Sequence, residues 1–427
     1  MDVLQSRIEK VLLPIGTWLG ENRYLTILRK AFMAVMPLTI TGSIALIIQF
    51  FPFIDKIIPA DIMMEISNFL GVVSSASLSL AALFLCASIG YYYTKEEGHE
   101  ALFGAIVGFS SFLIVTPLEM AVEGLEGMLS GVIPMTWLGG QGLFVAIIIG
   151  FLSSFLFNKL MKSRYTIKLP DSVPPMVTEP FKVLIPQFLT FIVLAAIRYG
   201  ISFTAFGDIH TLVFDILQTP LMALGTSLPA SIIVVIFIQL MWFMGLHGQN
   251  IAGAVMDPIW QAAMIANLTA VQNGGTPQYI FTSQFFTGFI WMQFSSLIIA
   301  CLIFAKSEQL KAVGKLSIGS ACFNISEPIV FGGPVVFNFI LLIPWVLSMV
   351  VYVISTWASM ALGICPLPLG TNIPWTTPPL ISGWLITGSP MGAVLQIVNV
   401  IVGIFVYLPF VKMYDKQLVE EESRAQS

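Results

Sequence analysis

The chain is organised as long apolar runs separated by short polar segments. Many of these runs are about 20 residues long, the length that a helix needs to cross a hydrocarbon layer roughly 30 Å thick. The pattern predicts an all-α, polytopic membrane protein with about ten transmembrane helices. The expected spans lie near residues 28–51, 71–93, 98–117, 134–157, 180–206, 229–248, 251–272, 280–305, 336–362 and 388–411.

The composition supports this prediction. Of the 427 residues, 57% are hydrophobic and only 10% are charged, whereas an average soluble chain is roughly a quarter charged. So few charges cannot make a water-exposed surface, and we expect the chain to be surrounded by a lipid bilayer, with no nucleic acid as partner. The net charge of −4 adds little, because in a membrane protein the location of the charges matters more than their sum.

The distribution of Lys and Arg predicts the orientation. Basic residues gather at both termini and in segments 158–182 and 306–315, whereas segment 118–134 has three acids and no Lys or Arg. By the positive-inside rule, ten crossings of a bacterial inner membrane with both termini in the cytoplasm fit this distribution. The first 30 residues lack a signal-peptide cleavage pattern, and the amphipathic spacing of residues 3–19 predicts a helix lying in the membrane interface.

Helix breakers divide the chain into two predicted domains, 1–206 and 207–427. The first has five regular spans and is interpreted as a scaffold. The second begins with a predicted interfacial helix, residues 208–227, and has breakers at membrane depth. Irregular backbone survives there only where protein buries it or where it lines a watery cavity, and many transporters build their substrate site from such breaks and from re-entrant hairpins. The breakers are GLHGQN (245–250), NISEPIVFGGP (324–334) and CPLPLGTNIPWTTPP (365–379).

Glu327 is the strongest candidate for a functional residue. It is the one charged residue between Lys315 and Lys412, and a carboxylate at membrane depth costs a few kcal/mol unless it has a partner or a role. Pro328 after it and Gly332 further on predict a re-entrant hairpin with the carboxylate at its tip. The alternative is a structural carboxylate that caps a broken helix end.

His247 is the second candidate. It lies between two glycines and is followed by Gln249 and Asn250, and such side chains both donate to and accept from a polyhydroxylated ligand. The alternative is an ordinary core histidine. In the third breaker, Trp375 is suited to stack on the apolar face of a sugar ring, unless it belongs to the interfacial aromatic belt. Gln141, in a Gly-rich stretch, is a weaker candidate for a polar residue facing the pore.

Other chemistry finds little support in the sequence. There is no Walker-type GxxxxGK[ST] motif, which argues against ATP hydrolysis by that route, and we expect neither cofactor nor metal. Asp257 precedes Pro258 and is interpreted as a helix cap in preference to an ion ligand. All four cysteines are expected to be buried thiols that behave as small hydrophobic side chains; they are Cys86, Cys301, Cys322 and Cys365.

The motifs GLHGQN and NISEPIVFG resemble those of the membrane-embedded enzyme IIC component of the bacterial phosphoenolpyruvate-dependent phosphotransferase system, in its lactose/cellobiose/diacetylchitobiose group. The resemblance covers nearly the whole chain. It implies translocation of a β-linked disaccharide coupled to phosphorylation at the sugar C6 hydroxyl, with Glu327 and His247 contacting that hydroxyl and Glu327 a candidate base. It further implies sugar-binding roles for Gln249, Asn250, Asn324 and Trp375.

The resemblance also has implications for assembly. Enzyme IIC proteins of this group are homodimers whose first five helices form the interface, while the later five helices and two hairpins hold the sugar. None of the four cysteines has the sequence context of a IIB phosphocysteine, so the phosphoryl donor is expected on a separate IIB protein, with IIA upstream. This chain would then be the permease component of a sugar phosphotransferase. The alternatives are a proton-coupled sugar symporter, in which Glu327 carries the proton, and a membrane receptor without transport.

Overall fold

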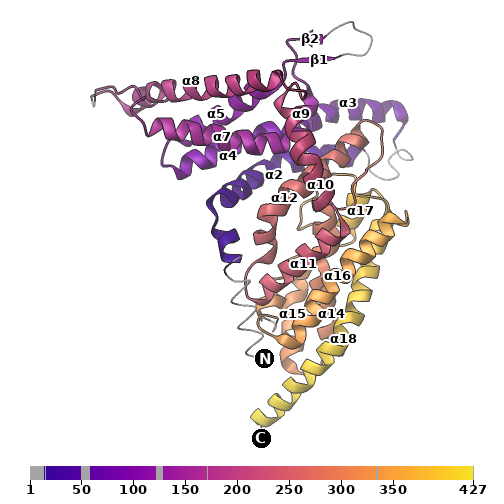
Figure 1. Ribbon diagram of the computed structural model, residues 1–427. Helices are drawn as coiled ribbons and strands as arrows, with labels where there is room; N and C mark the ends of the chain where they lie inside the picture. Colours follow the sequence, from indigo (N-terminus) through magenta and orange to yellow (C-terminus); the bar gives the residue numbers. More distant parts are fainter. Residues whose placement is uncertain are drawn as a thin grey trace. The chain divides into compact units, whose positions relative to one another are not determined.

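The computed structural model describes residue 14 and residues 16–49, 58–121, 128–170, 172–332 and 335–426. The described chain is mostly helical (Figure 1), which confirms the all-α prediction. Two short strands, β1 (Glu119–Ala121) and β2 (Met128–Ser130), form an antiparallel pair in which Glu119 lies opposite Ser130.

The chain separates into two compact units. Residues 23–45 and 68–222 form the N-terminal unit, and residues 223–427 with two shorter earlier segments form the C-terminal unit. The predicted domains, 1–206 and 207–427, differ from these units in two ways: the described parts of residues 1–22 and 46–67 group with the C-terminal unit, and residues 207–222 group with the N-terminal unit. The assignment of the two parts to scaffold and substrate binding stays a prediction.

The core of the N-terminal unit is made by α4, α5 and α7, which pack on one another. Small residues allow this: a Cβ atom on Gly90 would lie 2.1 Å from the carbonyl oxygen of Gly104. Close backbone approach through small residues is the usual way in which helices associate in membranes. The helices from α2 to α9 are α2 (Arg23–Gln49), α3 (Ala60–Ser77), α4 (Ala81–Glu96), α5 (Ala101–Val115), α6 (Met135–Leu138), α7 (Leu143–Met161), α8 (Pro175–Ser202) and α9 (Ile209–Val213).

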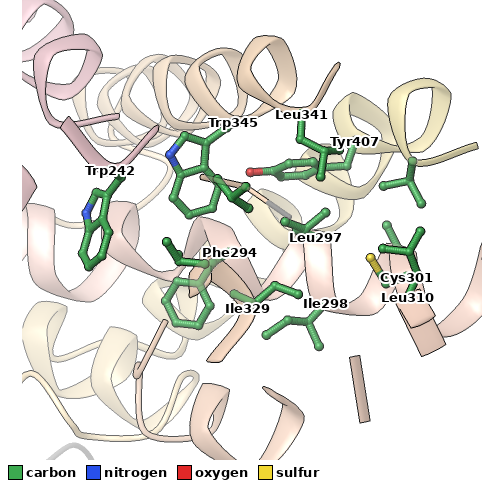
Figure 2. Packing of buried hydrophobic residues seen from close by; sticks show 14 of the residues in the cluster. Trp242, Phe294, Leu297, Ile298, Cys301, Leu310, Ile329, Leu341, Trp345 and Tyr407 are labelled. Carbon is green, nitrogen blue, oxygen red and sulfur yellow. The ribbon is translucent and has the colours of Figure 1, made fainter. Parts of the chain in front are cut away.

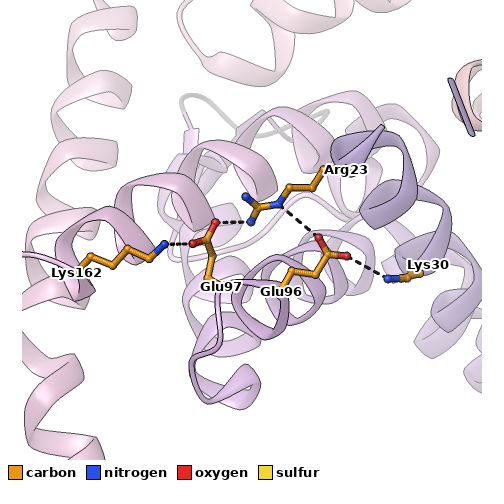
Figure 3. A network of polar contacts seen from close by, with 5 residues as sticks. All are labelled: Arg23, Lys30, Glu96, Glu97 and Lys162. Carbon is orange, nitrogen blue, oxygen red and sulfur yellow. Dashed lines mark hydrogen bonds and ion pairs between the residues drawn. The ribbon is translucent and has the colours of Figure 1, made fainter. Parts of the chain in front are cut away.

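A cluster of ion pairs joins three helices at one end of this unit (Figure 3). Glu97, just after α4, pairs with Arg23 of α2 and with Lys162 after α7. Glu96 pairs with Arg23 at 3.4 Å and with Lys30 at 3.1 Å. The hydrogen bond from Lys162 and the nearby Arg23 guanidinium hold the pKa of the Glu97 carboxyl below its usual value, against the opposing effect of burial.

This cluster predicts a pH-dependent stability. Because the pKa of Glu97 is lowered in the folded chain, its contribution is present above the unfolded pKa of about 4.3 and is lost as the pH falls through the folded value. We expect Glu97→Gln to lower stability by about 1 kcal/mol at neutral pH and to differ less from wild type near pH 4. Thermal unfolding at both pH values measures this. Glu100→Gln is the control, and a Glu97→Gln deficit of equal size at both pH values would contradict the ion pairing.

The core of the C-terminal unit is a large hydrophobic cluster, and most of its residues lie on α11, α14, α16 and α18. Figure 2 shows Trp242, Phe294, Trp345 and Tyr407 within it. Irregular turns interrupt the helical order, among them two π-helical turns, Phe286–Ile290 and Pro328–Gly332. The helices from α10 onward are α10 (Thr219–Gly225), α11 (Leu228–Phe243), α12 (Gly248–Gln272), α13 (Ser283–Phe285), α14 (Phe294–Phe304), α15 (Glu308–Ala321), α16 (Phe339–Ala361), α17 (Ile381–Thr387) and α18 (Pro390–Gln426).

Each of the ten expected spans coincides with a helix in the described part of the chain. Seven helical segments there are long and apolar enough to cross a membrane, or eight when α11 is joined to residues 209–225, from which it is bent by 70°. The remaining two expected spans correspond to α5, which has only 15 residues, and to α12, which has lower hydropathy. Length and composition alone therefore support fewer spans than the ten that the hydropathy pattern predicts.

Two expectations about single residues are wrong. Cys322 is exposed, whereas the other three cysteines are buried, because it follows the last buried residue of α15 as the chain turns away. Asp257 caps no helix: it lies inside α12, which continues through Pro258. Packing partners make proline tolerable within a membrane helix. Most of the expected interfacial helix at 3–19 lies outside the described residues, as do Gly333 and Pro334.

Candidate functional site

His247 and Glu327 face each other within the C-terminal unit, although they are distant in sequence. His247 Nε2 lies 3.8 Å from Glu327 Oε1, and the two side chains are 42% and 47% exposed. Both groups are therefore accessible to a ligand and close enough to act on the same atom of it.

The break between α11 and α12 positions His247. Gly245 has φ +79, a left-handed conformation that glycine adopts without steric cost. Its N–H donates to the Trp242 carbonyl at 3.0 Å, and the N–H of Leu246 donates to the Met241 carbonyl at 2.9 Å. These two bonds form a Schellman motif, so the sequence ends α11 at this point and turns the chain toward α12.

His247 is the N-cap residue of α12, and this role determines its tautomer. Its Nδ1 accepts a hydrogen bond from the backbone N–H of Asn250 at 3.3 Å. In a neutral imidazole the other ring nitrogen then carries the hydrogen. The Nε2–H donor therefore lies on the side of Glu327. The separation of 3.8 Å is too long for a direct hydrogen bond.

The first turn of α12 is pressed against α11. A Cβ atom on Gly248 would lie 2.2 Å from the Ile238 carbonyl oxygen, so a larger residue would force the helices apart. Trp242 donates its indole N–H to the Gln249 side-chain carbonyl, and its ring centroid lies 4.5 Å from that of His247. The buried Trp242 ring thus packs against the His247 ring. The side-chain carbonyl oxygen of Gln249 holds the indole in place by accepting its hydrogen bond.

Asn324 forms the turn that leads from α15 to Glu327. Its φ is +58, and the N–H of Ile325 donates to the Ser320 carbonyl at 3.1 Å across the turn. Asn is one of the few residues that tolerate this left-handed conformation. Its side-chain amide donates to the carbonyls of Trp375 at 2.8 Å and Thr377 at 3.1 Å. One side chain therefore connects the Glu327 turn to the loop that carries Trp375.

The same loop is held from its other side by buried amides. Gln284 donates to the Asn372 side chain at 3.1 Å and to the Ile373 carbonyl at 3.2 Å, and Asn267 of α12 donates to the Pro368 carbonyl at 2.9 Å. Trp375 itself is 49% exposed. The loop backbone is thus fixed while the indole is available for a ligand.

The structure brings some of the predicted site residues together and leaves others apart. His247 and Glu327 form the central pair, and Gln249 and Asn324 support it through Trp242 and through the Trp375 loop. Asn250 is exposed in the first turn of α12. Gln141 lies in a tight turn of the N-terminal unit, Gly140–Gly142, so its contribution stays a prediction.

Three supporting residues are missing from the sequence prediction, namely Trp242, Asn267 and Gln284. Trp242 stands three residues before Gly245, the first residue of the GLHGQN motif, so its position is a usable signal. Asn267 and Gln284 give no such signal, because their roles arise from contact with a loop distant in sequence.

The pair can bind a hydroxyl group. An oxygen placed about 2.8 Å from both His247 Nε2 and Glu327 Oε1 would accept from the imidazole N–H and donate to the carboxylate. A carboxylate that accepts the hydroxyl hydrogen is also placed to take that proton when the oxygen acts as a nucleophile. In the described ranges, no group of three or more His, Cys, Asp or Glu side chains is arranged to hold a metal ion.

Comparison with known proteins gives consistent results. The family described as "Phosphotransferase system, EIIC" matches residues 29–348. The "PTS system oligo-beta-mannoside-specific EIIC component" of Bacillus subtilis (strain 168) is 37% identical, over 98% of this chain and 96% of that protein. The "PTS system cellobiose-specific EIIC component" of Geobacillus stearothermophilus is 35% identical, over 99% and 96% respectively.

A solved structure resembles nearly the whole chain. It is the crystal structure of the transporter ChbC, the IIC component from the N,N'-diacetylchitobiose-specific phosphotransferase system. The TM-score is 0.92 with 37% sequence identity, and the match covers 97% of this chain and 99% of that one.

Proposed function

The chain belongs to the phosphotransferase system EIIC family, and from this premise we propose that it carries a β-linked disaccharide of the cellobiose or diacetylchitobiose type through the membrane while the sugar is phosphorylated at its C6 hydroxyl. The family and the apolar helices identify an integral membrane protein that acts within a sugar phosphotransferase system. Membership of this family contradicts the alternative of a proton-coupled symporter.

The observation that carries the proposal is the pairing of His247 with Glu327. The names of the similar proteins point to oligo-β-mannoside, cellobiose and diacetylchitobiose, and a C6 hydroxyl is common to these sugars. An exposed indole, Trp375, on a loop connected to the same turn offers a surface for a sugar ring.

In the proposed reaction, His247 and Glu327 orient the C6 hydroxyl. The hydroxyl oxygen attacks the phosphorus of a phosphocysteine on a separate IIB protein, which IIA phosphorylates upstream. An O–P bond forms, the S–P bond breaks, the cysteine leaves as a thiolate, and Glu327 takes the hydroxyl proton. Positioning of the acceptor oxygen and removal of its proton are the contributions of this chain.

The remaining parts of the proposal concern assembly. We place the protein in the bacterial cytoplasmic membrane with both termini in the cytoplasm, because Lys and Arg gather at the termini and basic segments face the cytoplasm. We further propose a homodimer formed through the N-terminal helices. Crosslinking in native membranes tests the dimer, and labelling of cysteines introduced into segments 158–182 and 118–134 from either side tests the orientation.

Reconstitution tests the central proposal. The full chain in proteoliposomes, supplied with phosphorylated IIB, is expected to convert cellobiose or diacetylchitobiose into its 6-phosphate. Lactose tests how broad the β-linked class is, and maltose, which is α-linked, serves as the negative control. Accumulation of unmodified disaccharide in response to a proton gradient, without IIB, would overturn the proposal.

A further inference from the structure

The N-terminus of α15 is capped from outside the helix. Ser307 stands at the N-cap position, where a serine side chain normally accepts a hydrogen bond from the first turn, but its hydroxyl makes no such bond. The first N–H groups of a helix have no partner within it and must find one elsewhere. Here the partners come from α18.

Two carboxylates of α18 accept these hydrogen bonds. Asp415 accepts from the N–H groups of Lys306 at 2.9 Å and Ser307 at 2.8 Å, and from the Ser307 hydroxyl at 2.7 Å. Glu422 accepts from the N–H groups of Glu308 at 3.2 Å and Gln309 at 3.1 Å. Negative charge at a helix N-terminus is favourable, and hydrogen bonds to charged groups are the stronger ones.

The same face of α18 packs against α15 through apolar side chains. Val411 and Leu418 belong to one buried cluster with Leu310 of α15. Val411, Asp415, Leu418 and Glu422 recur at i, i+4, i+7 and i+11, the spacing of a single helix face. The two carboxylates therefore lie on the same face of α18 as its buried apolar residues, and Asp415 is only 5% exposed.

The other end of α15 leads into the site. Asn324 turns the chain directly after the helix and bonds to the Trp375 loop, and Glu327 follows. A helix held at its first turn transmits a displacement of that turn along its axis, because its own hydrogen bonds keep its length fixed.

We propose that Asp415 and Glu422 are positioning residues for Glu327. By fixing the first turn of α15, they determine where the carboxylate stands relative to His247. This inference rests on the proposed sugar site, but it concerns residues of the C-terminal helix that touch no part of that site.

Substitutions that remove one charge distinguish a role of these carboxylates in positioning Glu327 from a role in folding. Asp415→Asn keeps the shape but places an NH₂ group among N–H donors, and Glu422→Gln does the same at a less buried position. Glu420→Gln is the matched control, because it removes the same charge from an exposed position on the same helix. The exposed thiol of Cys322 reports on the end of α15, since the other three cysteines are buried.

The experiment uses the full purified chain in nanodiscs. We measure the affinity for cellobiose, the rate of phosphorylation by phosphorylated IIB, and the rate at which a small maleimide alkylates Cys322. Asp415→Asn and Glu422→Gln are expected to elute as folded protein, bind cellobiose about tenfold more weakly, and show altered Cys322 alkylation, while Glu420→Gln matches wild type.

A merely structural role would lower the yield of folded protein but leave the folded fraction with wild-type affinity. That result would overturn the inference. If Asp415→Asn does not fold, wild-type affinity and wild-type Cys322 alkylation in Glu422→Gln would overturn it as well. Failure of the proposed function is recognised separately, because then the wild-type chain itself would not bind or phosphorylate the disaccharide.

Discussion

Glu327→Gln is expected to reduce the rate of sugar phosphorylation by about 100-fold or more, the usual cost of removing a general base. Glutamine keeps the size of the side chain and one oxygen that accepts from the sugar hydroxyl, so binding of cellobiose is expected to change much less. Rates with saturating phosphorylated IIB, together with binding constants for the purified chain, measure the two effects. Normal phosphorylation with weakened binding would show that Glu327 is a ligand and no base.

His247→Asn is the companion variant to Glu327→Gln. Asparagine is a favoured N-cap residue, so its side-chain oxygen is expected to replace His247 Nδ1 as acceptor for the Asn250 N–H. Only the Nε2 donor is lost. We therefore expect a folded protein with sugar binding weakened by about tenfold, and an unfolded variant would point to a structural role for the imidazole.

Asn324→Ala is expected to have the second largest effect. Alanine loses both bonds to the Trp375 loop and must adopt a left-handed conformation that costs about 1–2 kcal/mol, while each lost bond costs about 1 kcal/mol. The unfolding temperature and the sugar affinity are both expected to fall, the affinity by about tenfold or more. Thermal unfolding and binding of cellobiose to the purified variant measure these changes.

Asn324→Gly separates the two causes. Glycine adopts the left-handed conformation without strain, so it should retain more stability than alanine while losing the same two hydrogen bonds. Sugar affinity should fall equally in both variants. The control is Asn273→Gly, at the exposed C-cap of α12. If Asn324→Gly bound sugar like wild type, the bonds from Asn324 would not be what places Trp375.

The parts of the fold that depend on local composition could be predicted from the sequence. Apolar runs alone located a helix in each expected span, and the breakers around His247 and Glu327 marked two segments that the structure brings together. The cost of a carboxylate in an apolar half singles out Glu327 from the sequence alone.

What the sequence could not provide are the hydrogen-bond partners of the polar side chains. The sequence predicts that Asn324 binds the sugar, and the structure adds that its NH₂ group donates to the carbonyls of the Trp375 loop; its contact with the sugar stays a prediction. For Gln249 the sequence makes the same prediction, and the structure adds that its side-chain oxygen accepts from the Trp242 indole; its contact with the sugar also stays a prediction. The identity of an amide shows that it needs partners, but only the fold decides whether those partners are backbone, side chain or ligand.

The length of α18 has a consequence for access to the site from outside the bilayer. Its 37 residues correspond to roughly 55 Å of helix, which even a tilt of about 40° cannot contain within a hydrocarbon layer of about 30 Å. The charged end of the helix, which includes Glu422, must therefore extend beyond the hydrocarbon layer. One helix thus runs from within the membrane to the aqueous phase beyond it, and its far end carries the carboxylate of Glu422 that caps α15.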